Sequence, residues 1–459
     1  MFDTTTYIQR RRELKKKLGK GVVLFVGNEE CARNYPANTF EYRQDSNFLY
    51  FLGLNFPGLA AVLDLDENRD IVFGNDLDMD DIIWMGPQPL LADRCSLIGI
   101  TETRPAGDLG PYLAKVQKQG RKIHFLPPYR PDKAIFLEKL LGIRSESLHI
   151  YSSLELILAI AKLRSHKSDE EVAEIEKALA VSYDMYETAR RIIRPGAYES
   201  DIRGLMEGLA LSRGVALAFP PIVTIHGETL HNHHYGNRLE EGQLLLVDSG
   251  AESPLFYASD ITRTYPVSGK YTDRQKTIYS AVLEAQKTAI SLCKPDIKHR
   301  DVHLAACQTL AGKLKDAGLM KGDPAAAVAA GAHALFMPHG LGHMMGLDVH
   351  DMEDMGEKYI GYDQDTTRSD QFGLAYLRLA KKLEAGFVFT CEPGCYFIPE
   401  LIDRWHAEKK HLDFINYEEV EKYRTFGGIR IEDNIAVTPQ GCRVLGKPIP
   451  KEIAEIEKG

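Results

Sequence analysis

The stretch Leu244-Leu-Leu-Val-Asp248-Ser-Gly-Ala-Glu-Ser-Pro-Leu-Phe-Tyr-Ala-Ser-Asp260-Ile-Thr-Arg-Thr-Tyr-Pro266 decides the fold of the C-terminal half. An apolar run, a turn containing Gly, Ser and Pro, and a β-branched run predict a β-hairpin with one aspartate on each strand. A buried carboxylate is costly unless it is paired or binds a metal, and two neighbouring carboxylates also repel each other. A divalent cation such as Mg²⁺, Ca²⁺ or Mn²⁺ removes both costs. The alternative is that Asp248 starts a turn and Asp260 caps a local element.

The composition limits the class of protein. The chain has 459 residues, enough for two or three domains. With 44% hydrophobic and 26% charged residues it is typical of soluble globular proteins, and its net charge of -9 argues against a nucleic-acid partner. Its seven scattered cysteines include no CxxC pair, so they indicate neither a disulfide framework nor a thiolate zinc site, and they favour a cytoplasmic location. We expect no signal peptide and no membrane span, because the N-terminus is basic and polar and no apolar run approaches about 20 residues.

The N-terminal third alternates strand and helix patterns, which predicts an α/β domain over residues 1–163. No glycine-rich phosphate loop occurs in it, so no nucleotide site is expected. The expected helices are 7–19, 133–142 and 153–163, and the expected strands are 21–27, 48–53, 60–65 and 70–74.

A second domain is expected over residues 164–459. Ser168-Asp-Glu-Glu171 is a capping-box signature for a helix that runs to about Ile193. Further helices are expected at 199–213, 273–293 and 299–317. The polar segments 352–371 and 400–425 are expected to be ordered surface insertions, because they are charged and aromatic rather than rich in Gly and Ser.

Three later stretches carry residue types that bind metals. His339-Gly-Leu-Gly-His343 and the following His350 lie among glycines that disfavour a regular helix, the alternative for a histidine pair at this spacing. Glu392 follows an apolar strand and precedes Pro-Gly, where a turn residue is the alternative. Arg430 and Glu432 share one face of a strand, where an exposed ion pair is the alternative.

Together these stretches supply one histidine and four carboxylates, and two divalent cations would balance the four negative charges. Five mostly oxygen donors are too many for a single zinc ion, so a two-metal site with a bridging hydroxide is favoured. The set consists of Asp248, Asp260, His343, Glu392 and Glu432.

The ordered series of these residues, with His-Gly-Leu-Gly-His, Glu-Pro-Gly and Gly-Ile-Arg-Ile-Glu around them, resembles the pita-bread metallopeptidases of the Xaa-Pro aminopeptidase and prolidase branch. The resemblance implies an α+β pita-bread (creatinase/aminopeptidase) catalytic domain and identifies the five residues as ligands of two metal ions. Manganese is the ion expected, with cobalt or zinc as alternatives.

The resemblance also implies roles for three histidines. His231, 17 residues before Asp248, matches a histidine beside the scissile bond, although the crowded His231-Asn-His-His234 departs from the usual pattern and leaves His233 and His234 without a role. His350 matches a histidine that contacts substrate. His339 matches one that supports the ligands, and we group it with the substrate-binding residues.

The N-terminal domain resembles that of Xaa-Pro aminopeptidases and prolidases through Tyr42-Arg-Gln-Asp-Ser-Asn-Phe-Leu-Tyr-Phe-Leu-Gly53. Trp84 matches a tryptophan that closes a neighbouring subunit's active site, which implies a homodimer or a larger homo-oligomer; a core aromatic is the alternative. Arg378 matches the prolidase arginine that binds the free carboxylate of a dipeptide, and a solvated helix residue is its alternative.

The resulting hypothesis is an exopeptidase that hydrolyses the Xaa-Pro bond at the N-terminus of dipeptides or short peptides through a metal-bridging hydroxide. Glu392 would be both a metal ligand and the proton shuttle. His231 and His350 would steady the scissile carbonyl, and Arg430 would hold the metal ligands in place by hydrogen bonds. The alternatives are a strict Xaa-Pro dipeptidase, a creatinase-type hydrolase, and a catalytically silent peptide-binding module.

Overall fold

The computed structural model describes residues 1–458, and the chain divides into two compact units. The N-terminal unit comprises residues 1–164 with 354–356, and the C-terminal unit comprises residues 165–353 and those from 357 onward. Across the described residues no helix is both long and apolar enough to cross a membrane.

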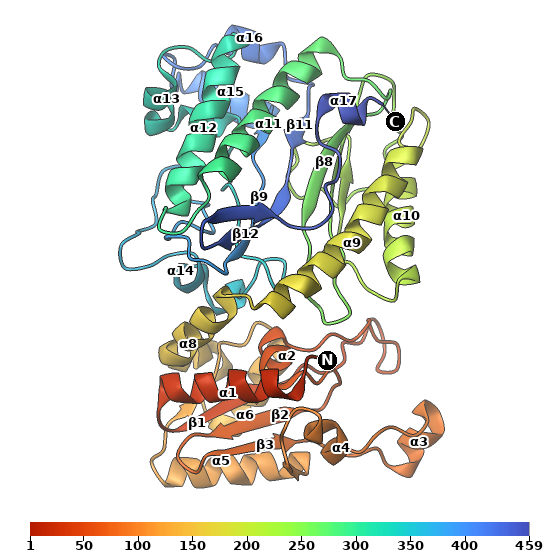
Figure 1. The fold of residues 1–459 in the computed structure, drawn as a ribbon, viewed down its shortest axis with the longest axis vertical. Coiled ribbons are helices and arrows are strands. Elements are labelled where there is room, and N and C mark those ends of the chain that lie inside the picture. The colour runs from red at the N-terminus through yellow and green to blue at the C-terminus, as the bar shows by residue number, and fades with distance from the viewer. Residues whose placement is uncertain (459) are drawn as a thin grey trace. The chain divides into compact units, whose positions relative to one another are not determined.

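The N-terminal unit is built on a five-stranded mixed sheet of order β4-β3-β2-β1-β5 (Figure 1). β2 pairs antiparallel with β1 and β3, whereas β4 and β5 join the edges in parallel. One face of the sheet packs on α5 and α6 through an aliphatic core that includes Val22, Leu113 and Leu137. The strands are β1 Val22–Val26, β2 Ala60–Asp64, β3 Arg69–Phe73, β4 Glu102–Arg104 and β5 Ile123–His124. The helices are α1 Thr4–Leu18, α2 Ser46–Leu52, α3 Met79–Met85, α4 Leu91–Ser96, α5 Leu109–Lys118, α6 Pro131–Leu141, α7 Leu148–Tyr151 and α8 Leu154–Ser165.

Most elements expected in this unit are present, but the strand expected over 48–53 is wrong. These residues lie in helix α2, which begins where the Asp45 side chain accepts from the Phe48 amide at 3.0 Å and ends at Gly53 in the left-handed conformation. Every residue of α2 is buried, so no polar stripe marks its period. Hydrophobic periodicity cannot separate a short buried helix from a buried strand, and here the aspartate cap and the glycine decide for the helix.

The C-terminal unit places paired long helices around short antiparallel sheets (Figure 1). The strand orders of these sheets are β6-β7-β8, β13-β12-β9 and β10-β11. The helix after the boundary begins as expected, with a capping box between Ser168 and Glu171. The helices are α9 Asp169–Ile192, α10 Glu199–Ser212, α11 Asp273–Leu292, α12 His299–Asp316, α13 Pro324–Ala330, α14 Glu357–Ile360, α15 Pro399–Ala407, α16 Tyr417–Glu421 and α17 Ile453–Ile456. The strands are β6 Ile222–Thr224, β7 Leu244–Ser249, β8 Ile261–Pro266, β9 Val388–Cys391, β10 Gly394–Tyr396, β11 Gly428–Arg430, β12 Asp433–Thr438 and β13 Gly441–Val444.

The expected hairpin is confirmed. β7 and β8 are antiparallel, with Asp248 opposite Thr262 and Ser249 opposite Ile261. Helix α9 supports the hairpin through the Tyr186 hydroxyl, which accepts from the Ser249 amide at 3.1 Å and donates to the Ile261 carbonyl. An isolated bridge between Thr262 and Glu432 joins β8 to the segment between β11 and β12. The hairpin therefore lies between a supporting helix and the strands that follow the C-terminal insertions.

The two polar insertions are ordered, as expected. The first contains α14, and the second contains α15 and α16. The Trp405 ring of α15 packs edge-on against Phe372 with ring centroids 5.9 Å apart, which ties the second insertion to the chain just after the first.

Candidate metal centre

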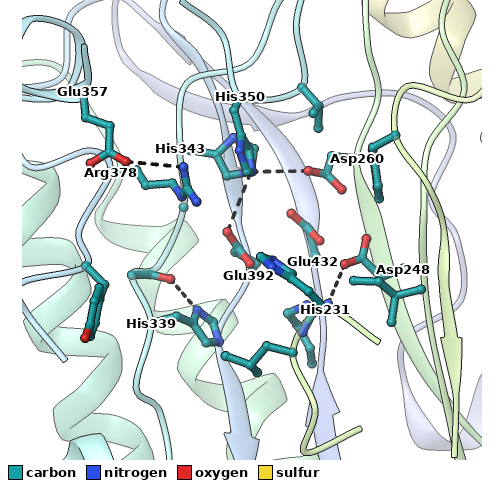
Figure 2. A pocket seen from close by; sticks show the side chains of 18 of the residues that line it. His231, Asp248, Asp260, His339, His343, His350, Glu357, Arg378, Glu392 and Glu432 are labelled. Atoms are coloured by element: carbon teal, nitrogen blue, oxygen red, sulfur yellow. Dashed lines mark hydrogen bonds and ion pairs between the residues drawn. The ribbon is translucent and has the colours of Figure 1, made fainter. Parts of the chain in front are cut away.

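A pocket of about 540 Å³ in the C-terminal unit brings together side chains from distant parts of the sequence (Figure 2). Its volume lies within the usual range for small-molecule sites, about 300–1,000 Å³. All five residues expected to bind metal line it: Asp248, Asp260, His343, Glu392 and Glu432.

The hairpin positions the two aspartates at one end of the pocket. Asp248 lies in β7, and Asp260 immediately precedes β8. The backbone of Asp260 is held from both sides by the Asn434 side chain, which accepts from its amide at 3.1 Å and donates to its carbonyl at 2.5 Å. Both aspartates are buried. The backbone of the hairpin thus sets where both carboxylates lie.

His343 enters the pocket from a loop that touches strand β9. A Cβ atom on Gly342 would lie 1.9 Å from the Thr390 carbonyl oxygen, so only glycine allows this approach. The Nδ1 atom of His343 lies 3.1 Å from the Met344 carbonyl, its natural acceptor, which leaves Nε2 as the atom that faces the carboxylates. That Nε2 atom lies 3.3 Å from Asp260 Oδ2 and 3.8 Å from Glu392 Oε1 (Figure 2).

The two glutamates reach the pocket from the ends of neighbouring strands. Glu392 follows the last residue of β9. Glu432 lies between β11 and β12, where its Oε2 atom accepts a hydrogen bond from the Thr262 hydroxyl at 2.6 Å. Arg430 and Glu432 both line the pocket, as the alternation of the strand predicts.

The pocket has an excess of negative charge at its buried end. Burial and the neighbouring Asp260 together raise the pKa of Asp248 to about 7, against the opposing effect of Arg430. The pKa of Glu432 is raised well above its ordinary value by burial and by three other carboxylates. Burial lowers the pKa of His343, but Asp260 and Glu392 outweigh this effect and raise it to about 9.

Two buried carboxylate oxygens, Asp248 Oδ1 and Glu432 Oε1, accept no hydrogen bond. The donor atoms of Asp260, His343 and Glu432 also lie within 4.8 Å of one another. Unpaired buried oxygens beside an imidazole nitrogen are what a divalent cation would bind. The residues present therefore fit the divalent ions implied by the ligand pattern.

Arg430 supports the aspartate at the end of β7. Its guanidinium is buried and donates to Asp248 Oδ2 at 2.5 Å, to the Thr262 hydroxyl at 3.1 Å and to the Tyr396 hydroxyl at 3.1 Å. The sequence alone did not identify Thr262 or Tyr396. Thr262 had a signal, because Asp260, Thr262 and Thr264 alternate along one face of the strand.

The three expected histidines all line the pocket. The His339 ring lies 2.8 Å from the Tyr396 hydroxyl, on the same tyrosine that Arg430 contacts. The His350 ring packs edge-on against His343 with centroids 4.3 Å apart, and burial lowers its pKa to about 2. His231 is more exposed, and burial followed by the charges of Arg430 and Arg378 lowers its pKa. His233 also lines the pocket.

The far side of the pocket carries a group of paired charges. Arg378 contacts Glu353, and its Nη1 atom lies 3.5 Å from Glu357 Oε1. Arg368, which the sequence did not single out, contacts Glu357 and also lines the pocket. The alternative for Arg378, a solvated helix residue, is wrong, because Arg378 lies outside the helices and lines the pocket.

Trp84 lies in the N-terminal unit, in helix α3, with 86% of its surface exposed. The alternative of a core aromatic is therefore wrong. Met79, Ile83 and Met85 of the same helix are also exposed, so α3 presents an apolar surface.

Comparison with known proteins places the chain in a family. Residues 173–439 match the model of metallopeptidase family M24, and residues 7–124 match the N-terminal domain of aminopeptidase P. The Xaa-Pro dipeptidase of Rattus norvegicus is 30% identical over 447 residues, which cover 96% of this chain and 88% of that protein. A probable Xaa-Pro aminopeptidase of Sordaria macrospora is 30% identical over 450 residues, 96% of this chain and 90% of that protein.

Solved structures of aminopeptidases match this chain over its whole length. A variant of Escherichia coli aminopeptidase P in complex with substrate has a TM-score of 0.82 at 26% identity, with 100% of this chain and 98% of that chain covered. Proline aminopeptidase P II from Yersinia pestis has the same TM-score and identity, with 99% of that chain covered. These matches confirm the resemblance and the expected fold, an aminopeptidase P-type N-terminal domain followed by a pita-bread domain. The chain belongs to metallopeptidase family M24 and is a metallopeptidase of the Xaa-Pro aminopeptidase and dipeptidase branch.

Proposed function

We propose that this enzyme is a dinuclear-metal exopeptidase that hydrolyses the Xaa-Pro bond at the N-terminus of dipeptides or short peptides. The observation that carries the proposal is the convergence of four carboxylates and one histidine in one pocket, with two buried carboxylate oxygens left unpaired. The names of its relatives agree with a substrate that has proline in second position.

The proposed ligands are Asp248, Asp260, His343, Glu392 and Glu432. Their four negative charges balance two divalent cations, and carboxylate-rich sets suit Mn²⁺, with Co²⁺ or Zn²⁺ as alternatives. The chemistry that two bound cations supply is activation of water at neutral pH. Arg430 holds Asp248 and Thr262 holds Glu432, so both carboxylates keep one fixed oxygen and present the other.

Glu392 is the proposed proton carrier. It follows β9 at the edge of the buried end and is the most exposed of the four carboxylates, so one of its oxygens can reach a reacting water molecule. A carboxylate there would take the proton from the attacking water and pass it to the leaving nitrogen. Transfer of this proton matters because proline leaves as a secondary amine. Positioned general acids and bases typically contribute about 10²–10⁴-fold to a rate.

His231 and His350 are the proposed donors to the scissile carbonyl. Both line the pocket, and the edge-on contact of His350 with His343 holds its ring beside the proposed metal ligands. Donors aimed at the developing oxyanion are worth roughly 3 kcal/mol each. His339 would act through Tyr396, which also contacts Arg430.

A strict dipeptidase is the second candidate, and Arg378 favours it. Its ion pairs with Glu353 and Glu357 both use the Nη1 atom, whereas a guanidinium carries five N–H donors. The remaining donors suit the free carboxylate of a dipeptide, which would lie beside proline on the far side of the pocket from the buried end.

We also propose that Trp84 closes the active site of a second copy of the chain, in a homodimer or larger homo-oligomer. The exposure of Trp84 and of its apolar neighbours on α3 supports this assembly. A cytoplasmic location belongs to the same proposal, and it agrees with seven cysteines that form no disulfide.

The test is hydrolysis of Ala-Pro beside Ala-Pro-Ala-Ala by chelator-treated enzyme after Mn²⁺ is added back. Release of alanine from either peptide, dependent on added metal, supports the exopeptidase. Cleavage of the dipeptide alone supports the strict dipeptidase, whereas cleavage of both supports the broader enzyme. No cleavage of either peptide with metal bound would overturn the proposed function.

Arg378→Ala separates the two candidates. A strict dipeptidase should lose roughly 10²-fold in kcat/KM for Ala-Pro, a charge-assisted hydrogen bond of about 3 kcal/mol. The matched control is Arg404→Ala on α15, which removes an exposed arginine paired with Glu408 at 3.0 Å and should leave the rate unchanged. An Arg378→Ala enzyme with unchanged dipeptide kinetics would exclude the carboxylate clamp.

A further inference from the structure

A second group of metal-binding residue types lies buried in the C-terminal unit, and none of its members lines the catalytic pocket. It consists of His303 and Cys307, one turn apart on α12, and His333 in the short 3₁₀ turn Ala332–Leu335. The candidate ligand atoms of the three residues all lie within 4.8 Å of one another. Each residue is at most 1% exposed.

The hydrogen bonding of this group is incomplete. The Cys307 Sγ atom lies 3.4 Å from His303 Nε2, and the His303 ring packs edge-on against the His333 ring with centroids 6.3 Å apart. Within residues 1–458, both ring nitrogens of His333 and the Nδ1 atom of His303 have no hydrogen-bond partner. The Val328 carbonyl opposes the effect of burial on the pKa of His333, but it does not meet either nitrogen in hydrogen-bond geometry. A buried polar group without a partner typically costs about 1–3 kcal/mol.

The separation of two of the candidate ligand atoms is close to the separation expected around a bound metal ion. Donor atoms of a cysteine and a histidine that share a tetrahedral zinc ion lie about 3.6 Å apart, given bond lengths of about 2.3 and 2.05 Å. The separation of 3.4 Å between Cys307 and His303 agrees with this value. A thiol that donates to His303 would give the same distance, but it would leave both nitrogens of His333 unexplained.

We propose that His303, Cys307 and His333 bind a thiolate-preferring metal ion, Zn²⁺ or Cu⁺, at a site separate from the catalytic pair. Sulfur and imidazole ligands select these ions over the Mn²⁺ that suits the carboxylates of the pocket. Zn²⁺ would complete four-coordination with one further donor, whereas Cu⁺ with one thiolate and two neutral imidazoles would give a site without net charge. On binding, the Cys307 S–H bond breaks, a sulfur–metal bond forms and one proton passes to solvent, with no change in oxidation state.

The protonation states of the group agree with this site. Burial lowers the pKa of His333 to about 4 and holds the pKa of His303 well below its usual value, so both rings are neutral and able to bind. Burial raises the pKa of the Cys307 thiol, so the thiolate would form only with the metal.

The position of the site gives it a structural role. His333 lies ten residues before His343, and the intervening segment carries His339 into the catalytic pocket. An ion bound to α12 and to His333 would fasten this segment to a long helix. The segment around Gly373 packs tightly against the turn that carries His333. A Cβ atom on Gly373 would lie 2.7 Å from the Ala334 side chain and 3.6 Å from His333 Nε2. A bound ion would therefore stabilise the support of the catalytic loop without taking part in the reaction.

The first experiment replaces the metal with Co²⁺ in the full-length protein. Sulfur-to-cobalt charge transfer absorbs in the near ultraviolet, and the five proposed catalytic ligands contain no sulfur. The site predicts this band in the wild-type enzyme and its loss in Cys307→Ser. Cys95→Ala is the matched control, because it removes another fully buried thiol, in the N-terminal unit, and should keep the band.

The second experiment counts metal in Asp260→Asn/Glu432→Gln, which removes two of the proposed catalytic ligands. The double variant should still retain one zinc or copper ion, and the addition of His333→Gln should remove it. Retained copper that a Cu⁺-specific chelator extracts identifies Cu⁺; retained zinc identifies Zn²⁺.

Absence of the charge-transfer band in the wild-type enzyme, together with a double variant that retains neither metal, would overturn the proposal. Neither readout depends on peptidase activity, so an inactive enzyme that keeps the cobalt–thiolate band would contradict the proposed function alone.

Discussion

Carboxylates are buried in the N-terminal unit and in the catalytic pocket, but their charges are satisfied differently in the two places. In the N-terminal unit Asp45 accepts from Lys133 Nζ at 2.8 Å and from the Phe48 amide at 3.0 Å, and Asp64 accepts from Arg121 and from the Tyr112 hydroxyl at 2.6 Å. Each of these aspartates is thus paired with a cation. Lys133 and the other donors outweigh the effect of burial and lower the pKa of Asp45.

In the catalytic pocket the buried carboxylates outnumber the cations that pair with them. Four carboxylates share Arg430 and His343, and two of their buried oxygens have no partner. Carboxylate side chains are buried in both places, so neither the carboxylate group nor its burial identifies a metal site. The number of cations per buried carboxylate distinguishes the two places, because burying more carboxylates than cations is costly unless a metal ion binds them.

The largest expected effect concerns the reaction. Glu392→Gln should lower kcat by about 10²–10⁴-fold, because the amide cannot carry the proton to the leaving nitrogen. Hydrolysis of Ala-Pro at saturating Mn²⁺, with metal content measured on the same sample, checks it. Glu400→Gln, at the start of α15, is the control. A metal-saturated Glu392→Gln enzyme with the wild-type rate would show that another group carries the proton.

Asp45→Asn should destabilise the N-terminal unit by about 3–5 kcal/mol, because it leaves the buried Lys133 ammonium without its counter-charge. Urea denaturation followed by hydrogen exchange in the strands of this unit measures the change. Glu13→Gln removes an exposed ion pair with Lys16 and should change stability by less than about 0.5 kcal/mol. Equal effects of the two variants would show that the buried Asp45–Lys133 pair matters no more to stability than an exposed pair.

Glu432→Gln should stabilise the chelator-treated protein, whereas Asp45→Asn destabilises it. Loss of one charge among four clustered carboxylates relieves repulsion, so the C-terminal unit should become more stable by about 1–2 kcal/mol. With metal restored, the same variant should be less stable than wild type because a ligand is missing. Thermal denaturation with and without Mn²⁺ tests both expectations. A loss of stability in the chelator-treated variant would contradict the expected relief of repulsion among the carboxylates.

The smallest effect is expected at low pH. The pKa of Asp45 is lowered in the folded protein, so its contribution is present above the unfolded value of about 3.9 and is lost as the pH falls through the folded value. The stability difference between wild type and Asp45→Asn should therefore shrink towards zero below about pH 4. Denaturation curves from pH 7 to pH 3 would show a constant difference instead if Lys133 were not the partner that matters.

The sequence predicted the parts of the site that follow local rules. Asp248, Asp260, Glu392 and Glu432 stand at strand ends marked by apolar runs and turns, and the structure brings all four into one pocket. The strand expected at 48–53 failed because a wholly buried helix has no amphipathic period, and the deciding signals were single residues, Asp45 and Gly53.

Other partners depend on contacts between distant segments. Tyr396 meets His339 and Arg430 only because β10 pairs with β11. The sequence did not predict the group of His303, Cys307 and His333 for a similar reason. A search for CxxC pairs cannot find one cysteine on a helix face opposite a histidine 26 residues later.

The contact between Gly342 and the Thr390 carbonyl has a consequence for engineering. Backbone meets backbone there, so no rearrangement of a neighbouring side chain can make room for a larger residue. A library randomised at this position should return glycine almost alone. Attempts to change the metal preference of the enzyme would do better to randomise Thr262 and Tyr396, whose hydroxyl groups hold Glu432 and Arg430 through side-chain contacts.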